Sequence, residues 1–175
     1  MPMSFLTQEW AADVRRSINA GPDAGLRARK ADNYWDWVDR VRTRYRWSWA
    51  LGGQPTAEGP QFYLLLCWSG GSCSSATVVG ADEAERADFL LTASHQVWRA
   101  LFDGLDPGRA VMDRAIRLRR GSVLEFFRGL YLFTETIASI CRVPTVFPDV
   151  HTPNSTLGAA GSTGSGGFVE SGGLR

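Results

Sequence analysis

The pattern of apolar and polar positions predicts a helix near the start of the chain. Trp10, Val14 and Ile18 recur every four positions within residues 7–19, which places them on one face of a helix. Thr7 is a suitable N-terminal cap, because its hydroxyl can accept a hydrogen bond from a free backbone N–H of the first turn. A Gly-Pro pair follows the segment and ends the helix.

A period of two predicts strands through the middle of the chain. Within residues 38–51, arginines alternate with larger uncharged residues, so we expect a strand with one cationic face and one mostly apolar face. The cationic face carries Arg40, Arg42, Arg44 and Arg46, and the opposite face carries Val41, Thr43, Tyr45, Trp47 and Trp49. Four more strands are predicted within residues 61–68, 74–80, 87–94 and 115–120.

Helical signals return in the second half of the chain. Ser94 is a suitable N-cap, and Asp106 followed by a proline is a second helix start. Ser122 and Glu125 have the spacing of a capping box, which opens a helix predicted to run over residues 122–141. The apolar face of this last helix is wider than a two-layer core requires.

The composition is that of one globular domain with a tail. The chain has 175 residues, of which 44% are hydrophobic and 21% are charged. We expect a domain over residues 1–150 and a disordered, Gly/Ser-rich tail over residues 151–175. Neither a secretory signal nor an apolar run long enough to span a membrane is present, which predicts a soluble, cytoplasmic protein. The eighteen arginines against one lysine indicate a GC-rich, bacterial genome.

Charge and reactive residues narrow the classes of function. A net charge of +1 gives no electrostatic reason to expect a nucleic-acid partner. The three cysteines and two histidines do not have the spacing of a metal site or a catalytic triad, so we expect no metal. The glycine-rich turns match neither nucleotide-binding fingerprint, and no cofactor is predicted. No catalytic residue can be assigned, so the sequence does not identify an enzyme.

The order of motifs over residues 87–121 resembles the central part of sterol-carrier-protein domains. In that family an acidic-aromatic strand leads into a tryptophan-bearing helix, a Leu-Asp-Pro turn, a methionine-bearing helix, an alternating strand and a long apolar helix. The matching positions here are Asp88-Phe89, Trp98, Leu105-Asp106-Pro107, Met112, Ile116-Arg117-Leu118-Arg119 and residues 122–141. The resemblance covers about residues 5–145. It departs at Arg114, where the family often has glycine, and at Arg120-Gly121, where it often has Gly-Asp.

The resemblance implies an α/β (α+β) fold in which a five-stranded, mainly antiparallel sheet and its helices enclose an apolar tunnel. It implies binding or carrying of a hydrophobic small molecule of the lipid, fatty acyl, sterol-like or polyketide-like class. Two alternatives stay open. One is an enzyme that cyclises or otherwise converts a hydrophobic intermediate in the same tunnel, and the other is an accessory subunit of another enzyme. A homodimer and a transient membrane-surface contact are also left open.

Large apolar residues of the predicted helices are candidate ligand contacts. They are Trp98, Phe102, Met112, Phe126, Phe127, Leu130 and Phe133. A pocket lined by such side chains would suit an apolar ligand. The alternative is an ordinary core, since burying each of them is worth about 1.5–3 kcal/mol. The arginine face of residues 40–46 likewise has two interpretations, an anion-binding rim or a solvated sheet face.

Overall fold

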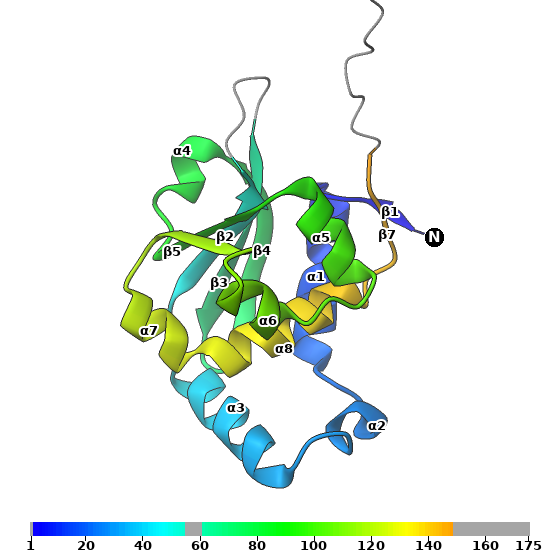
Figure 1. Cartoon of the computed structure of the whole chain (residues 1–175), viewed down its shortest axis with the longest axis vertical. Helices are drawn as coiled ribbons and strands as arrows, with labels where there is room; N and C mark the ends of the chain where they lie inside the picture. Colours follow the sequence, from blue (N-terminus) through cyan, green and yellow to red (C-terminus); the bar gives the residue numbers. More distant parts are fainter. Residues whose placement is uncertain (1, 55–60, 149–175) are drawn as a thin grey trace, which may run out of the picture.

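Five strands form the central sheet, in the order β4-β3-β2-β5-β6 (Figure 1). The structure is a computed structural model that describes residues 2–54 and 61–148. The strands are β2 (Ser48–Gly53), β3 (Phe62–Ser69), β4 (Ser72–Gly80), β5 (Phe89–Ala93) and β6 (Arg117–Arg120). β2 runs parallel to β5, and the other neighbouring strands are antiparallel. The predicted five-stranded, mainly antiparallel sheet is confirmed.

Most helices cover one face of the sheet or extend beyond its lower end (Figure 1), and the short helix at Ala81–Ala84 packs against the opposite face. They are α1 (Gln8–Ala20), α2 (Ala24–Arg27), α3 (Asp32–Arg44), α4 (Ala81–Ala84), α5 (His95–Phe102), α6 (Pro107–Met112), α7 (Val123–Arg128) and α8 (Leu130–Cys141). A short parallel pair, β1 (Met3–Ser4) with β7 (Thr145–Val146), joins the start of the chain to the segment after α8.

The main core lies between the sheet and the helices α1, α5 and α8. Trp49 of β2 and Leu91 of β5 are fully buried there, as are Phe133 and Ile137 of α8. The ring of Trp49 packs against Phe133 at a centroid distance of 5.5 Å. Each such side chain contributes about 1.5–3 kcal/mol by leaving water, so this layer provides most of the fold's hydrophobic stabilisation.

The predicted strand over residues 38–51 is wrong in its first part. Residues up to Arg44 form α3, and only the segment from Ser48 onward is a strand. Trp35 and Val38 are three positions apart and both buried, which is helical spacing. The Arg42 guanidinium reaches back to the Gly71 carbonyl oxygen at 2.6 Å, so this arginine points inward. Tertiary contacts therefore override the alternating pattern.

The four arginines consequently do not share one strand face. Arg40 and Arg44 are exposed on α3, and Arg42 is half-buried beneath it. Arg46 lies in the connection between α3 and β2 and is exposed. The cationic sheet face predicted from the alternation is thus corrected to two exposed arginines on a helix, with a third in the connection that follows.

The helix predicted over residues 122–141 is broken at Gly129. α7 ends at Arg128, and α8 begins at Leu130. A Cβ atom placed on Gly129 would lie only 3.0 Å from the Tyr45 ring. Glycine thus allows the backbone to approach that ring closely while the chain changes direction. The two helices consequently cover different parts of the sheet.

The first helix and the helix starts in the second half of the chain agree with the sequence prediction, whereas the short elements α2, α4, β1 and β7 were not predicted. Thr7, Ser94, Asp106 and Ser122 each cap a helix through a side-chain oxygen that accepts a backbone N–H. The predicted tail over residues 151–175 lies outside the described residues, so the domain boundary stays a prediction. Over the part of the chain that the structure describes, no helix has the length and apolar character needed to cross a membrane.

Candidate functional site

An open groove of about 730 Å³ lies between α6, β6 and α7. Its volume falls within the range of about 300–1,000 Å³ that is typical of small-molecule sites. The apolar lining consists of Val111, Met112, Ile116, Leu118, Val123, Phe126 and Phe127. The cationic lining consists of Arg114, Arg117 and Arg119. We call this cavity the α6–β6–α7 groove.

The first wall of the groove is built by a short, strongly capped helix. Asp106 accepts a hydrogen bond from the Arg109 N–H at 2.7 Å, and Pro107 occupies the first helical turn. α6 then ends at Met112, whose side chain is 66% exposed. Arg114 follows with a backbone φ of 59°, in the left-handed region that rarely suits a side chain. This conformation turns the chain back toward β6.

The second wall combines an edge strand with the helix that follows it. β6 pairs with β5, and Arg119 is the extra residue of a bulge, because Leu90 faces Arg120 whereas Leu91 faces Leu118. Gly121 has a φ of 111°, and a Cβ atom there would lie 2.4 Å from the Phe89 ring. Only glycine can therefore make this turn between β6 and α7 without strain.

The groove has a buried apolar floor and exposed apolar walls. Ile116 and Phe126 are buried, with Phe126 only 1% exposed. Val123 and Phe127, on the α7 side, are 62% and 43% exposed. Large apolar side chains facing water next to a buried apolar floor are typical of a site that a ligand covers.

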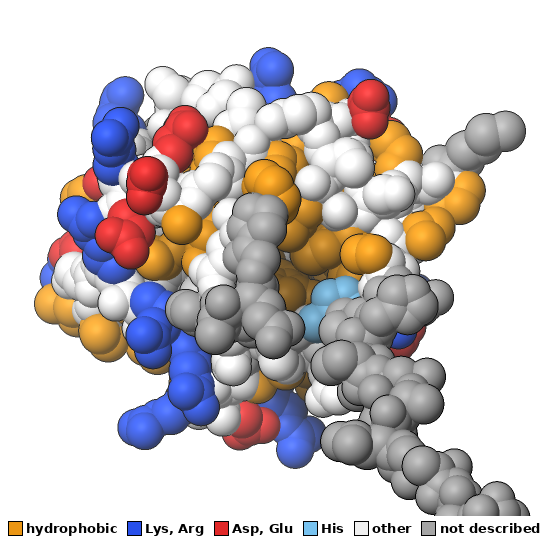
Figure 2. All heavy atoms as spheres, turned by 90° about the horizontal axis from the view of Figure 1, so that it is seen from above, with side chains coloured by type: hydrophobic (Ala, Val, Ile, Leu, Met, Phe, Trp, Pro, Cys, Tyr) orange, Lys and Arg blue, Asp and Glu red, His pale blue; other side chains and the backbone are white. Residues whose placement is uncertain are grey.

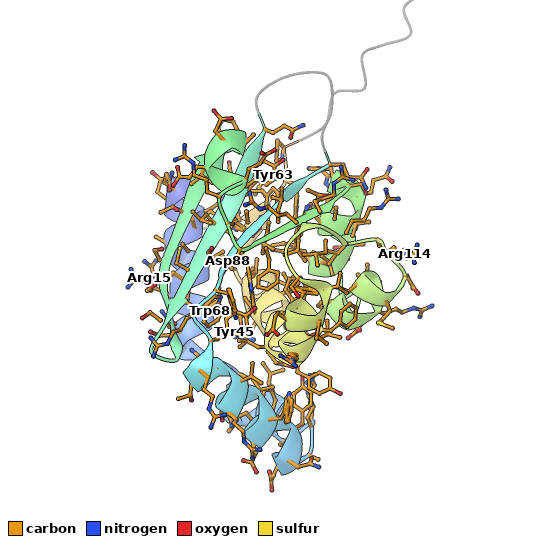
Figure 3. The ribbon with its side chains drawn as sticks, turned by 90° about the vertical axis from the view of Figure 1, so that its left-hand side faces the viewer. Arg15, Tyr45, Tyr63, Trp68, Asp88 and Arg114 are labelled. Atoms are coloured by element: carbon orange, nitrogen blue, oxygen red, sulfur yellow. The ribbon has the colours of Figure 1, made fainter. Side chains whose placement is uncertain are left out.

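Arginines form a cationic rim around the apolar walls. Arg114, Arg117 and Arg119 are exposed, and none of them forms an ion pair among the described residues. Arg114 lies at the outer edge of the molecule, on the side opposite Arg15 (Figure 3). No carboxylate, histidine, cysteine or tyrosine is among the described residues that line the groove. The lining thus offers apolar contact and positive charge rather than an acid–base pair.

The structure brings three of the seven candidate ligand contacts into this groove, namely Met112, Phe126 and Phe127. Trp98 is buried elsewhere, and its indole N–H donates to the Gly52 carbonyl oxygen at 3.0 Å. Phe133 is fully buried against Phe126, at a centroid distance of 5.1 Å.

The two other candidates also lie away from the groove. Phe102 packs against Phe147 at a centroid distance of 5.1 Å, and Leu130 is half-buried beside the core. As ligand contacts, all seven residues stay predictions, and so does the enclosed tunnel.

Several lining residues were not among the sequence candidates. Ile116 lies just before β6, and Leu118 lies within it. Both alternate with arginines, a pattern that predicts one apolar strand face. Val123 lies in the first turn of α7, within the helix predicted over residues 122–141. The alternation predicted the strand, and the helical spacing predicted the helix. Neither pattern shows that the strand and the helix line the same groove.

Two tyrosines that could act as proton donors, Tyr63 and Tyr131, lie outside the groove. The Tyr63 hydroxyl donates to the Gln61 side-chain oxygen at 2.9 Å, and burial raises the pKa of this phenol above its usual value. Tyr131 is exposed and packs against Tyr34. Among the described residues, no group of histidine, cysteine, aspartate and glutamate side chains is arranged to hold a metal ion.

The overall fold is similar to solved structures of sterol carrier proteins. No family model matches the chain, and no curated protein matches it. A crystal structure of sterol carrier protein 2 superposes with a TM-score of 0.62 at 21% identity, covering 80% of this chain and 99% of that one. A solution structure from Thermus thermophilus, of a conserved hypothetical protein suggested to be a sterol carrier protein, gives 0.61 at 20% identity, with coverage of 82% and 92%. The chain therefore has the sterol carrier protein fold.

Proposed function

We propose that this protein binds an apolar small molecule in the α6–β6–α7 groove. The observation that carries the proposal is the groove itself, in which exposed Met112 and Phe127 flank buried Phe126 around about 730 Å³. Covering these side chains with an apolar ligand removes their surface from water, which stabilises the complex by about 25 cal/mol per Å² before the costs of binding. The similarity of the fold to sterol carrier proteins supports the same function.

The cationic rim favours a ligand with an anionic end, such as a long-chain carboxylate. Arg114 holds a left-handed backbone conformation, which costs a non-glycine residue about 1–2 kcal/mol. Residues held in such conformations cluster at binding sites, where their side chains have a role that compensates for the strain. A guanidinium at the rim can pair with a carboxylate through two parallel hydrogen bonds. Arg117 and Arg119 add positive charge on the same rim.

Binding without chemical conversion is the function that the groove supports best. An enzyme that cyclises an intermediate by orientation alone would need a closed site that excludes water. Here the walls are open to solvent at Met112 and Phe127. Neither the enzyme nor the accessory-subunit alternative gains support from a specific described group.

The test is direct ligand binding with a matched pair of variants. Native mass spectrometry and calorimetry should detect a long-chain fatty acid on the wild-type protein, bound more tightly than the alcohol of equal length. Phe127→Glu places a carboxylate in the groove wall and should weaken fatty-acid binding about tenfold or more, a change of about 1.4 kcal/mol per factor of ten. Leu124→Glu is the control, because Leu124 is 62% exposed on the same helix but does not line the groove.

Two results would overturn the proposal. One is the absence of binding across fatty acids, alcohols and sterols. The other is an equal loss of affinity in Phe127→Glu and Leu124→Glu, which would indicate a general effect on α7 rather than a ligand contact.

A further inference from the structure

A second surface combines tryptophans with unpaired arginines. On α3, Arg40 and Val41 lie three and four positions after Trp37, and Arg44 lies seven positions after it, so the four residues share one helix face. Trp37 is 46% exposed. Arg40 and Arg44 are exposed and form no ion pair or hydrogen bond through their side chains within the described residues. This face is separate from the buried face of α3, which packs on the core.

The surface continues from α3 across to α7, its neighbour at the lower end of the molecule (Figure 1). A hollow of about 480 Å³ lies between them and is lined by Trp37, Trp47 and Arg128 in addition to Arg40 and Arg44. Trp47 is 41% exposed and is held by an edge-to-face contact with Phe89 at 5.9 Å. The Trp47 indole therefore has a defined position, and Trp37 is carried by the helix α3.

α7 also carries an exposed apolar residue, Leu124, between this hollow and the α6–β6–α7 groove. Leu124 lies three positions before Phe127, which faces the groove, and four before Arg128, which faces the hollow. The Leu124 side chain is 62% exposed. We use the name α3–α7 face for the surface formed by Trp37, Arg40, Arg44, Trp47 and Leu124.

Positive charge predominates in the hollow, as it does at the rim of the α6–β6–α7 groove. Glu125 is the acidic residue that lines the hollow, and it is paired with Arg128 at 2.5 Å. Asp39 of α3 points away from the face and pairs with Arg27 at 3.1 Å. The end of the molecule that carries α4 and α5 instead shows acidic and basic side chains side by side (Figure 2). In a chain of net charge +1, the unpaired arginines around two tryptophans are a local excess.

We propose that the α3–α7 face docks on the surface of an anionic lipid bilayer. Tryptophan rings are enriched at the level of the lipid headgroups, where the ring is partly dehydrated and its N–H stays hydrogen-bonded. Leu124 would enter the acyl boundary beside them, as apolar residues of surface-bound helices do. Arg40 and Arg44 would pair with lipid phosphates and carboxylates, which attract basic residues near the membrane surface. Because α7 borders both surfaces, docking would place the α6–β6–α7 groove beside the bilayer.

The experiment uses the full chain and vesicles without added ligand, so that it is independent of the proposed small-molecule binding. Co-sedimentation compares vesicles of phosphatidylcholine and phosphatidylserine with vesicles of phosphatidylcholine alone. We expect binding to the anionic vesicles, weakening as salt is raised, because salt screens attraction between exposed charges. Brominated lipids should quench fluorescence of the wild-type protein more than that of the Trp37→Phe, Trp47→Phe double variant.

Charge-matched variants locate the contact. Arg40→Gln with Arg44→Gln should weaken binding to the anionic vesicles about tenfold or more, since each basic residue near such a surface adds a several-fold effect. Arg15→Gln with Arg86→Gln removes the same charge from exposed positions elsewhere and should change binding far less. Circular dichroism confirms that both double variants are folded.

Three outcomes would overturn the proposal. The wild-type protein fails to bind anionic vesicles, or both pairs of variants weaken binding equally. Alternatively, analytical ultracentrifugation shows a dimer that Leu124→Glu dissociates, which would assign this face to a second copy of the chain. Fatty-acid binding measured without vesicles would be unaffected by any of these results, so the two proposals can fail separately.

Discussion

Arg114 is one of two non-glycine residues, with Leu6, that hold a left-handed backbone conformation in the described part of the chain. Its φ of 59° suits glycine. Glycine is also the residue that the sterol-carrier-protein domains that this chain resembles often have at this position. Gly121, at the other end of β6, shows the opposite case, since a Cβ atom there would lie 2.6 Å from the Asp88 carbonyl oxygen. A side chain is thus tolerated at the first turn, where the surroundings are open, and excluded at the second. In the proposed function, a contact between the Arg114 side chain and the anionic end of the ligand would compensate for this strain.

Replacing Arg114 with glycine should stabilise the protein while weakening ligand binding. Arg114→Gly relieves about 1–2 kcal/mol of strain in the left-handed backbone. It also makes the unfolded chain more flexible, which destabilises the folded state by about 0.5–1 kcal/mol. The expected gain in the free energy of unfolding is therefore about 0–1.5 kcal/mol, measured by urea denaturation. Arg117→Gly, in extended backbone on β6, is the control and should destabilise by about 0.5–1 kcal/mol. Equal destabilisation by both variants would contradict the assigned strain.

At the scale of elements, α7 is unusual because its neighbouring phenylalanines have opposite environments. Phe126 is 1% exposed and packs against Phe89 at 6.0 Å, whereas Phe127 is 43% exposed. A six-residue helix is too short to be stable by itself, so α7 stays in place through Phe126 and through its cap at Ser122. Phe127, whose ring meets Phe126 edge to face at 5.8 Å, contributes less to that attachment and stays partly exposed.

Alanine substitutions should separate the two roles. Phe126→Ala removes a buried ring and should lower the free energy of unfolding by about 3–5 kcal/mol. Phe127→Ala should cost about 1 kcal/mol or less without ligand, because part of its ring already faces water, but it should weaken fatty-acid binding. Denaturant unfolding with a parallel binding measurement gives both values. A loss above about 3 kcal/mol for Phe127→Ala with unchanged binding would show that the residue is ordinary core.

The stability of the whole molecule should depend on pH through His95, the first residue of α5. Its Nε2 atom is buried without a hydrogen-bond partner among the described residues. Burial lowers the pKa of His95, and the neighbouring charge of Arg99 lowers it further. The folded state therefore holds this proton less tightly than the unfolded state, in which a histidine has a pKa of about 6.5.

It follows that the free energy of unfolding should decrease as the pH falls below about 6.5, because protonation favours the unfolded state. Urea unfolding at several values between about pH 7.5 and 5.5 measures the slope. His95→Gln removes the titrating group and should give a flatter profile, while His151 is present in both proteins and does not affect the comparison. An identical slope in the variant would contradict the role of His95.

Much of this architecture could be predicted from local sequence. The caps at Thr7, Ser94, Asp106 and Ser122 act within one helical turn, so nearby residues are sufficient to identify them. The strand β3 follows from an apolar run and β6 from alternation, and turn residues bound the strands between them, all of which are local properties. The overall order of these elements was enough to indicate the fold through its resemblance to a family.

Tertiary structure decided the rest, because the deciding contacts join residues far apart in the chain. The segment before Arg44 fits both the period of two of a strand and the spacing of a helix. It becomes a helix because Trp35 and Val38 are buried and the Arg42 side chain donates to the Gly71 carbonyl oxygen. The break at Gly129 depends on the Tyr45 ring, which belongs to another part of the chain. The α6–β6–α7 groove joins three elements whose residues look like ordinary core or surface in the sequence. A period along the chain shows which residues share a face, but only packing determines what that face meets.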